Sequence, residues 1–198
     1  PQTTIKMDGF FDDWNTIMNT YIDDSTDSQG IDLISFSVCN DNQYLFVKLC
    51  FAFEIDLTEQ SFNPAEIIIN IDADNNPSTG FSINNIGSEY GINFLEKFVF
   101  DDTDSNMVDT LSLYDLDIIT LPSITSKEFE IAINRSLFSD TIAISIRDLI
   151  GNDFMPDNGS IFTYIFNNCS FPSNSSIDFK KNNSHNLRLM TYNVLNNG

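Results

Sequence analysis

Short stretches in which apolar and polar residues alternate constrain the fold of this chain more than any other feature. In residues 31–39, Ile34, Phe36 and Val38 alternate with polar or small residues, so they would face one side of a strand. An Asn-Asp-Asn turn follows at residues 40–42, and residues 45–51 resume the same period of two. The two stretches together predict a β-hairpin with one buried face.

Further segments with strand character follow along the chain. Residues 65–71 form a nearly continuous β-branched run, which predicts a central strand covered on both faces. Turn-forming residues separate other candidate strands at 90–94, 98–100, 107–114, 117–121, 127–134, 141–147 and 161–166. Only residues 12–18 and 136–138 suggest helical turns. About ten short strands predict an all-β fold, a jelly-roll-like antiparallel β-sandwich of two sheets.

The composition changes near residue 171. Hydrophobic residues make up 41% of the chain, enough for one core, and the apolar segments end before this point. We therefore expect a β-sandwich domain at 1–170 and a flexible, Ser-, Asn- and Lys-rich linker at 171–186. Residues 187–198 begin with a new strand-like segment, which we interpret as the truncated start of a following domain.

The charge excludes two classes of partner. The chain has 29 acidic and 9 basic residues and a formal net charge of -20, which would repel phosphate backbones and anionic lipid headgroups. No apolar stretch is long enough to span a bilayer. We therefore expect neither direct nucleic-acid binding nor membrane binding. The acidity is a solubilising surface, a store of ligands for divalent cations, or both.

An acidic loop follows the most hydrophobic predicted strand. Residues 72–80 read Asp-Ala-Asp-Asn-Asn-Pro-Ser-Thr-Gly, and Asp72, Asp74 and Asn76 can direct three oxygen-bearing side chains inward. Ca²⁺ requires about six to eight oxygen ligands, so this spacing predicts a calcium site, with Glu89 as a more distant carboxylate. The alternative is an Asx-rich turn whose side chains bind backbone amides.

An EF-hand is excluded at this loop. Pro77 stands where that motif requires Gly, Ile83 stands where it requires a bidentate Glu, and no helices flank the loop. A calcium site in a loop between strands remains. Loops at one end of a sandwich cluster in space, and three more acidic residues are expected to join this site: Asp23, Asp24 and Asp27.

The sequence contains little material for catalysis. Its single histidine, His185, lies in the predicted linker, and no Gly-x-Ser-x-Gly motif is present. We therefore assign no catalytic residue. Trp14 is the only tryptophan, and it either stacks on a sugar as an exposed platform or closes one end of the core. Cys39 and Cys50 lie near opposite ends of one predicted hairpin, so we expect thiols instead of a disulfide between them.

Several of these segments, taken in order, resemble the calcium-binding β-sandwiches of family 9 carbohydrate-binding modules and DOMON-like domains. The similarity lies in Met-Asp-Gly-Phe-Phe-Asp-Asp-Trp at residues 7–14, the hairpin at 41–47, Ile-Asp-Ala-Asp-Asn-Asn at 71–76 with Thr79-Gly80, Glu89-Tyr90 and residues 129–137. The resemblance implies calcium at Asp72 and Asp74 and a structural role for Asp13 and Trp14. This chain has no second tryptophan to form the aromatic clamp of the sugar-binding members.

The end of the chain resembles a different family. Leu-Arg-Leu-Met-Thr-Tyr-Asn-Val at residues 187–194 is similar to the first strand of endonuclease/exonuclease/phosphatase domains, in which the Asn, here Asn193, lies at the metal and phosphate site. The resemblance implies that residues 1–170 are a non-catalytic accessory module joined to a C-terminal phosphoesterase or nuclease domain. The alternatives are a carbohydrate-binding module for extracellular glycans and a structural adhesion domain. Pro1 at the start fits removal of a leader, or trimming, and we expect a secreted or cell-surface protein.

Overall fold

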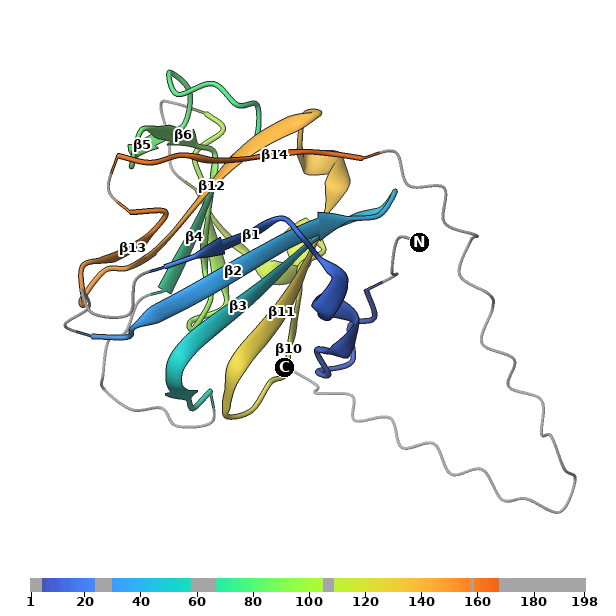
Figure 1. The fold of residues 1–198 in the computed structure, drawn as a ribbon. Coiled ribbons are helices and arrows are strands. Elements are labelled where there is room, and N and C mark those ends of the chain that lie inside the picture. The colour runs from blue at the N-terminus through green and yellow to red at the C-terminus, as the bar shows by residue number, and fades with distance from the viewer. Residues whose placement is uncertain (1–4, 24–29, 58–66, 105–108, 158, 168–198) are drawn as a thin grey trace, which may run out of the picture.

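The protein is described by a computed structural model that covers residues 5–23, 30–57, 67–104, 109–157 and 159–167. Two antiparallel sheets face each other in this part of the chain (Figure 1). The prediction of an all-β, two-sheet antiparallel β-sandwich is therefore confirmed. The predicted linker at 171–186 and the predicted start of a second domain at 187–198 lie outside the described residues.

The first sheet has five strands in the order β1-β2-β3-β11-β10. All neighbouring pairs are antiparallel, and β2 and β3 form the hairpin that the alternation predicts. The bounds are β1 (Thr20–Ile22), β2 (Leu33–Asn40), β3 (Tyr44–Ile55), β10 (Ile119–Leu121) and β11 (Ser126–Asn134).

The second sheet follows the order β13-β12-β4-β7-β8-β9, and β14 pairs with β12 on the edge that β13 also occupies. A two-stranded hairpin, β5–β6, is separate from both sheets. The bounds are β4 (Ile67–Asp72), β5 (Phe81–Ile83), β6 (Ile86–Ser88), β7 (Tyr90–Asn93), β8 (Phe98–Asp101), β9 (Asp109–Ser112), β12 (Thr141–Asp148), β13 (Asp153–Met155) and β14 (Phe162–Ile165).

Helical structure in the described residues is limited to short 3₁₀ turns. These are η1 (Asp12–Thr16), η2 (Leu113–Leu116) and η3 (Arg135–Leu137). The first and third confirm the helical turns predicted near residues 12–18 and 136–138. The second overlaps the end of the segment 107–114 that we predicted as strand, because β9 ends at Ser112. No described helix has the length and apolarity needed to span a membrane.

The main core lies between the two sheets. Val47 and Leu49 of β3 face Ile69 and Ile71 of β4 within one cluster, and all four side chains are fully buried. Burying a side chain of this kind contributes about 1.5–3 kcal/mol relative to leaving it in water. The inward-facing positions predicted for β3 are therefore confirmed. Cys39 and Cys50 are thiols, as expected.

A β-bulge changes one predicted core position on β2. Leu33 pairs with Phe51 and Ser35 pairs with Cys50, so two steps along β2 oppose one step along β3. Because a bulge shifts the side chains that precede it to the other face, Leu33 is fully buried in the core while Ile34 is only partly buried. The prediction that Ile34 shares a face with Phe36 is wrong for this reason.

Strand β4 is covered on both faces. All six of its residues are buried, and it lies between β12 and β7. Ile67, Ile69 and Ile71 belong to the core, so Ile68, Asn70 and Asp72 face outward by alternation. The central, doubly covered strand predicted from this β-branched run is confirmed.

The N-terminal segment covers the outer face of the five-stranded sheet (Figure 1). Ile5 and Trp14 form a second apolar cluster with Phe46 of β3 and Ala132 of β11. The segment is attached by the carboxylate of Glu130, which is fully buried on β11.

Glu130 receives three hydrogen bonds from the N-terminal segment. The backbone N–H groups of Asp8 and Gly9 donate to Oε1 at 2.8 and 2.7 Å, and Trp14 Nε1 donates to Oε2 at 3.2 Å. Burial of a carboxylate is costly unless its oxygens are satisfied in this way. Glu130 therefore couples the N-terminal segment to the sheet.

We expect Glu130→Ala to lower the free energy of unfolding by about 3 kcal/mol, since removal of the carboxylate leaves three donors without their acceptor. Urea denaturation followed by Trp14 fluorescence measures this effect. Glu128→Ala is the matched control: it lies two residues away on the same strand, in a partly exposed pair with Lys48, and should change stability by less than about 1 kcal/mol. Equal losses in the two variants would contradict the role of Glu130.

Candidate metal centre

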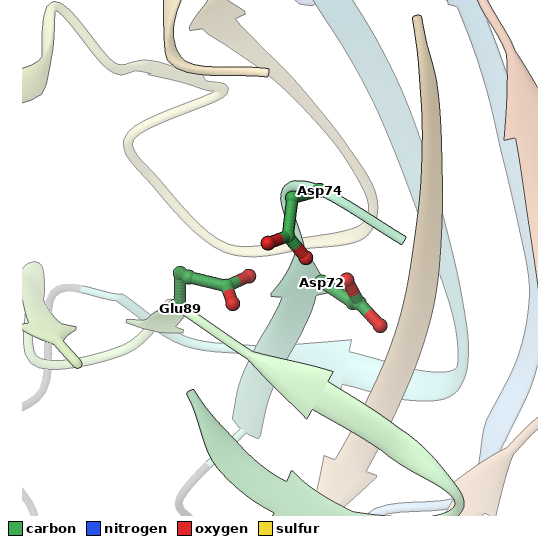
Figure 2. Close-up of side chains that lie close together, drawn as sticks. All are labelled: Asp72, Asp74 and Glu89. Carbon is green, nitrogen blue, oxygen red and sulfur yellow. The ribbon is translucent and has the colours of Figure 1, made fainter. Parts of the chain in front are cut away.

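Three carboxylates meet where β4 ends. Asp72 is the last residue of β4, Asp74 follows in the loop, and Glu89 stands between β6 and β7. One carboxylate oxygen from each lies within 4.8 Å of the others. Figure 2 shows Glu89 and Asp74 directed toward one another, with Asp72 beside them. The structure thus brings together three of the seven metal ligands that we predict from the sequence.

Side-chain to backbone hydrogen bonds shape the loop. The backbone N–H of Asn76 donates to Asp72 Oδ1 at 2.9 Å and to Asp74 Oδ1 at 3.0 Å. The Thr79 hydroxyl donates to Asp74 Oδ1 at 3.1 Å. These are the local bonds by which Asp folds a chain into a tight turn. The loop therefore folds as an Asx-type turn. Its carboxylate oxygens keep further lone pairs that a ligand can use.

The β5–β6 hairpin closes over the loop because two glycines permit a close approach. Gly87 N donates to Asp72 Oδ2 at 3.2 Å, and a Cβ atom at Gly87 would lie 2.6 Å from the carbonyl oxygen of Asn76. Gly80 has a φ of +64°, and a Cβ there would lie 2.5 Å from the Ser88 carbonyl group. Only glycine fits both positions. The sequence thereby holds the hairpin directly beside Asp72.

Glu89 is the most informative member of the cluster. Its side chain is 7% exposed, and Oε2 accepts a hydrogen bond from the backbone N–H of Ala73 at 2.7 Å. Oε1 is buried and has no hydrogen-bond partner among the residues that the structure describes. A buried carboxylate oxygen in this state is unfavourable unless a cation or water binds it.

Burial raises the pKa of Asp72 and the pKa of Glu89, because desolvation penalises the charged form. Backbone N–H groups lower the pKa of both groups, and the Thr79 side chain also lowers that of Glu89, while the negative charge of Asp74 raises the pKa of both. Within the described residues, the two ion pairs involve other carboxylates. The site therefore concentrates negative charge that no Lys or Arg of the described residues neutralises.

The donor set fits a hard divalent cation. All three side chains offer oxygen, Asp74 is exposed, and Asp72 and Glu89 are shielded from water. Oxygen ligands from carboxylates and backbone carbonyls are those that Ca²⁺ prefers, whereas structural zinc sites use Cys and His. Asp72, Asp74 and Glu89 would hold such an ion, and backbone carbonyls of the loop and water would complete its coordination.

Asn76 and two of the more distant predicted ligands contribute differently. The side-chain oxygen of Asn76 accepts a hydrogen bond from Ser78 N at 3.1 Å, so Asn76 stabilises the turn through both its side chain and its backbone. Asp24 and Asp27 lie outside the described residues.

Asp23 lies at the other end of the sandwich. Its backbone N–H donates to the carbonyl of Ile34 at 2.9 Å, and the neighbouring Leu33 N donates to Asp153 Oδ2 on β13 at 2.8 Å. β13 pairs with the part of β12 that lies opposite the start of β4, whereas Asp72 ends β4. Five residue steps, about 16 Å along a strand, separate these two ends. The prediction that Asp23 joins Asp72 is therefore wrong. Acidic loops occur at both ends of this sandwich, and Asp23 lies at the end opposite Asp72.

Trp14 is buried. It is 3% exposed, packs in the N-terminal cluster and donates to Glu130. Its ring therefore offers no face on which a sugar could stack, and the interpretation that it closes one end of the core describes its position. The sequence analysis did not assign site roles to Thr79 and Gly87. The Thr79-Gly80 pair at the end of the loop 72–80 was the available signal for Thr79.

No protein-family model, no curated protein and no solved structure matches this chain.

The pKa directions predict how stability depends on pH without metal. Because folding raises the pKa of Asp72 and Glu89, their contribution is present below the ordinary carboxyl pKa of about 4 and is lost as pH rises through the raised values. In EDTA, the free energy of unfolding should fall less between pH 4 and pH 7 in Glu89→Gln than in the wild type, since the amide does not titrate. Urea denaturation at each pH measures this difference.

The control for this measurement is Asp109→Asn, which removes an exposed carboxylate on β9. We expect the wild-type pH dependence in this variant. Parallel curves for the wild type and Glu89→Gln would show that folding does not raise the pKa of Glu89 and would contradict this prediction.

Proposed function

We propose that this β-sandwich is a non-catalytic calcium-binding module whose metal site is formed by Asp72, Asp74 and Glu89. One observation carries the proposal: the buried Oε1 of Glu89 has no hydrogen-bond partner in the described structure and belongs to a cluster of three carboxylates. A bound cation would satisfy this oxygen and neutralise the like charges around it.

Calcium suits the site better than other divalent ions. Ca²⁺ accepts six to eight oxygens in flexible geometry, whereas Mg²⁺ requires near-ideal octahedral coordination and retains several waters. A loop held by Asx-type hydrogen bonds, with two shielded carboxylates and one exposed one, offers a crowded and irregular oxygen set. The ion would join the loop 72–80 to the segment between β6 and β7, and its role is therefore structural.

The proposed biological role is that of an accessory module in a secreted or cell-surface hydrolase. The support comes from the sequence: residues 187–194 resemble the first strand of endonuclease/exonuclease/phosphatase domains, and a linker-like segment precedes them. The net charge of -20 opposes direct nucleic-acid binding by the module. The module would stabilise or position a phosphoesterase or nuclease domain. The carbohydrate-binding alternative receives no support from Trp14, whose ring is buried.

Calcium should raise the melting temperature. A ligand at a concentration about 100 times its Kd stabilises a protein by about 2.7 kcal/mol, which corresponds to roughly 5–10 °C for a domain of this size. Scanning calorimetry with CaCl₂ and with EGTA measures the shift. We expect Glu89→Gln and Asp74→Asn to abolish most of it, and Asp109→Asn, an exposed control, to retain it. A wild-type melting temperature that calcium leaves unchanged would refute the proposal.

The isolated chain should not hydrolyse phosphodiesters. We expect no turnover of bis-p-nitrophenyl phosphate above the buffer rate, with or without calcium and magnesium, because the single histidine lies in the predicted linker and the chain has no Gly-x-Ser-x-Gly motif. A spectrophotometric assay at high protein concentration checks this. Activity that is lost on mutation of a carboxylate in the β-sandwich would overturn the non-catalytic assignment.

A further inference from the structure

A groove of about 250 Å³ lies on the outer face of the seven-stranded sheet. Its lining residues come from β4, β7, β8 and β12, from the β5–β6 hairpin and from the segment after β8. Five of them define its floor, its apolar walls and its negative charge: Ile68, Phe81, Gly91, Phe100 and Asp102. The three carboxylates of the proposed metal centre do not line the groove, so it is a separate surface.

Gly91 forms the floor of the groove. Asn70 on β4 pairs with Gly91 on β7, and Gly91 pairs with Phe100 on β8, so the three residues form one row across the sheet. The missing side chain in the middle of this row leaves a depression between its neighbours. A Cβ at Gly91 would lie 3.6 Å from side-chain atoms of Ile68 and Phe100, which is an ordinary contact. The backbone therefore tolerates a side chain here, and the glycine matters for the space that it leaves.

The walls of the groove are apolar. Phe81 is 49% exposed and Phe100 is 39% exposed, while Ile68 is buried. The guanidinium carbon of Arg147 lies 5.8 Å from the centroid of the Phe81 ring, and we assign Arg147 only this packing role in the groove. Two partly exposed rings beside a depression of this size provide an apolar contact surface for one aromatic side chain.

Asp102 gives the groove a negative charge. Its backbone N–H donates to the carbonyl oxygen of Glu89 at 2.8 Å, which fixes the start of the segment after β8. No described Lys or Arg forms an ion pair with the Asp102 carboxylate. The rest of the domain adds to this charge, because residues 1–167 contain 28 acidic and 6 basic residues. A partner that fits this groove therefore combines an apolar side chain with positive charge.

The C-terminal segment, residues 168–198, carries positive charge. It lies outside the described residues and contains three basic residues and one acidic residue. Lys180 and Lys181 follow directly after Phe179, so residues 177–181, Ile-Asp-Phe-Lys-Lys, combine an aromatic ring with two positive charges. Phe171, the other phenylalanine of the C-terminal segment, has no charged residue within six positions. Residues 177–181 are therefore complementary to the groove in both polarity and charge.

The C-terminal segment is long enough to reach the groove of its own chain. The described chain ends at Asn167, two residues after β14, and Ile165 of β14 pairs with Thr141 of β12. Arg147, which lines the groove, lies six residues further along β12, about 20 Å away. Phe179 follows Asn167 by twelve positions, and an extended chain of this length spans up to about 40 Å.

We propose that residues 177–181 dock in this groove of the same chain. Phe179 enters the apolar part of the groove, and Lys181 pairs with Asp102. Side chains two residues apart lie on the same side of an extended segment, so Phe179 and Lys181 face the groove together while Lys180 faces water. Burial of the Phe179 ring supplies most of the stabilisation, since an exposed ion pair contributes little. The proposal goes beyond calcium binding and does not rest on it.

Carbodiimide cross-linking of the full chain, in buffer with CaCl₂, tests this contact. The reagent joins a carboxylate to a lysine amine where the two groups touch, and mass spectrometry of the digest identifies the joined residues. We expect Asp102 to be the main partner of Lys181. In a mixture of isotope-labelled and unlabelled protein, the product should form within one chain. Products that join a labelled to an unlabelled chain, or Lys181 joined mainly to carboxylates outside the groove, would overturn the proposal.

Variants of the C-terminal segment separate docking from random encounters. Phe179→Ala should lower the yield of the Asp102–Lys181 product at least about tenfold, because the ring that anchors the segment is lost. Phe171→Ala is the matched control, since it removes the same type of side chain eight residues earlier. It should give the wild-type yield. An unchanged yield in Phe179→Ala, or an equal loss in both variants, would contradict docking through Phe179.

A variant of the groove tests its shape. Gly91→Val fills the floor and should lower the yield as much as Phe179→Ala does, and circular dichroism establishes that it is folded. If Gly91→Val does not fold, Phe81→Ala on the β5–β6 hairpin replaces it and should lower the yield at least about threefold. Asp109→Asn, an exposed position on β9, is the control and should cross-link like the wild type. A wild-type yield in the folded groove variant would show that the segment binds elsewhere.

Discussion

The double burial of β4 is the constraint on which the remaining structure depends. One face of the strand places Ile67, Ile69 and Ile71 in the core, and the other face carries Ile68, Asn70 and Asp72. Because side chains alternate along a strand, packing of the isoleucines also determines where the outward-facing residues lie. The same strand thus positions Asp72 at the proposed metal centre and Ile68 and Asn70 in the groove. A shift of one residue in the pairing register of β4 would exchange its two faces, and it would disrupt the core, the metal centre and the groove.

Two of the buried carboxylates, those of Glu130 and Glu89, are satisfied to different degrees. Glu130 receives three hydrogen bonds from the N-terminal segment, so its negative charge is balanced by local donors. Glu89 receives one, from Ala73, and shares its surroundings with two other carboxylates. The first arrangement suffices for a structural role. At Glu89, a cation would supply the positive charge and the oxygen contact that the chain does not provide. This contrast with Glu130 supports the calcium proposal.

Strands and turns with a clear local pattern of apolar or turn-forming residues were the ones that could be predicted. β3 and β4 were predicted from alternation and from a β-branched run, and η1 and η3 from short turn signals. The bulge at Ile34 and the strands β1, β5, β6 and β13 were not predicted. A bulge depends on pairing with β3, and strands of three residues carry too little periodicity to be distinguished from turns. For Trp14 the sequence left two alternatives, an exposed sugar-binding ring and a buried core residue. Its contact with Glu130 on a distant strand, in the folded chain, decided for the buried position.

The sequence by itself determined the all-β class, the central strand and the acidic loop after it, because these depend on side-chain period and on turn chemistry within a few residues. Only the tertiary structure decided which acidic residues meet. Glu89 lies beside Asp72 because β4 and β7 are paired. Asp23 is bonded to Ile34 and lies at the opposite end of the sandwich. The groove at Gly91 likewise exists only through the register of three strands. Contacts between distant segments follow from sheet order and register, which local patterns do not specify.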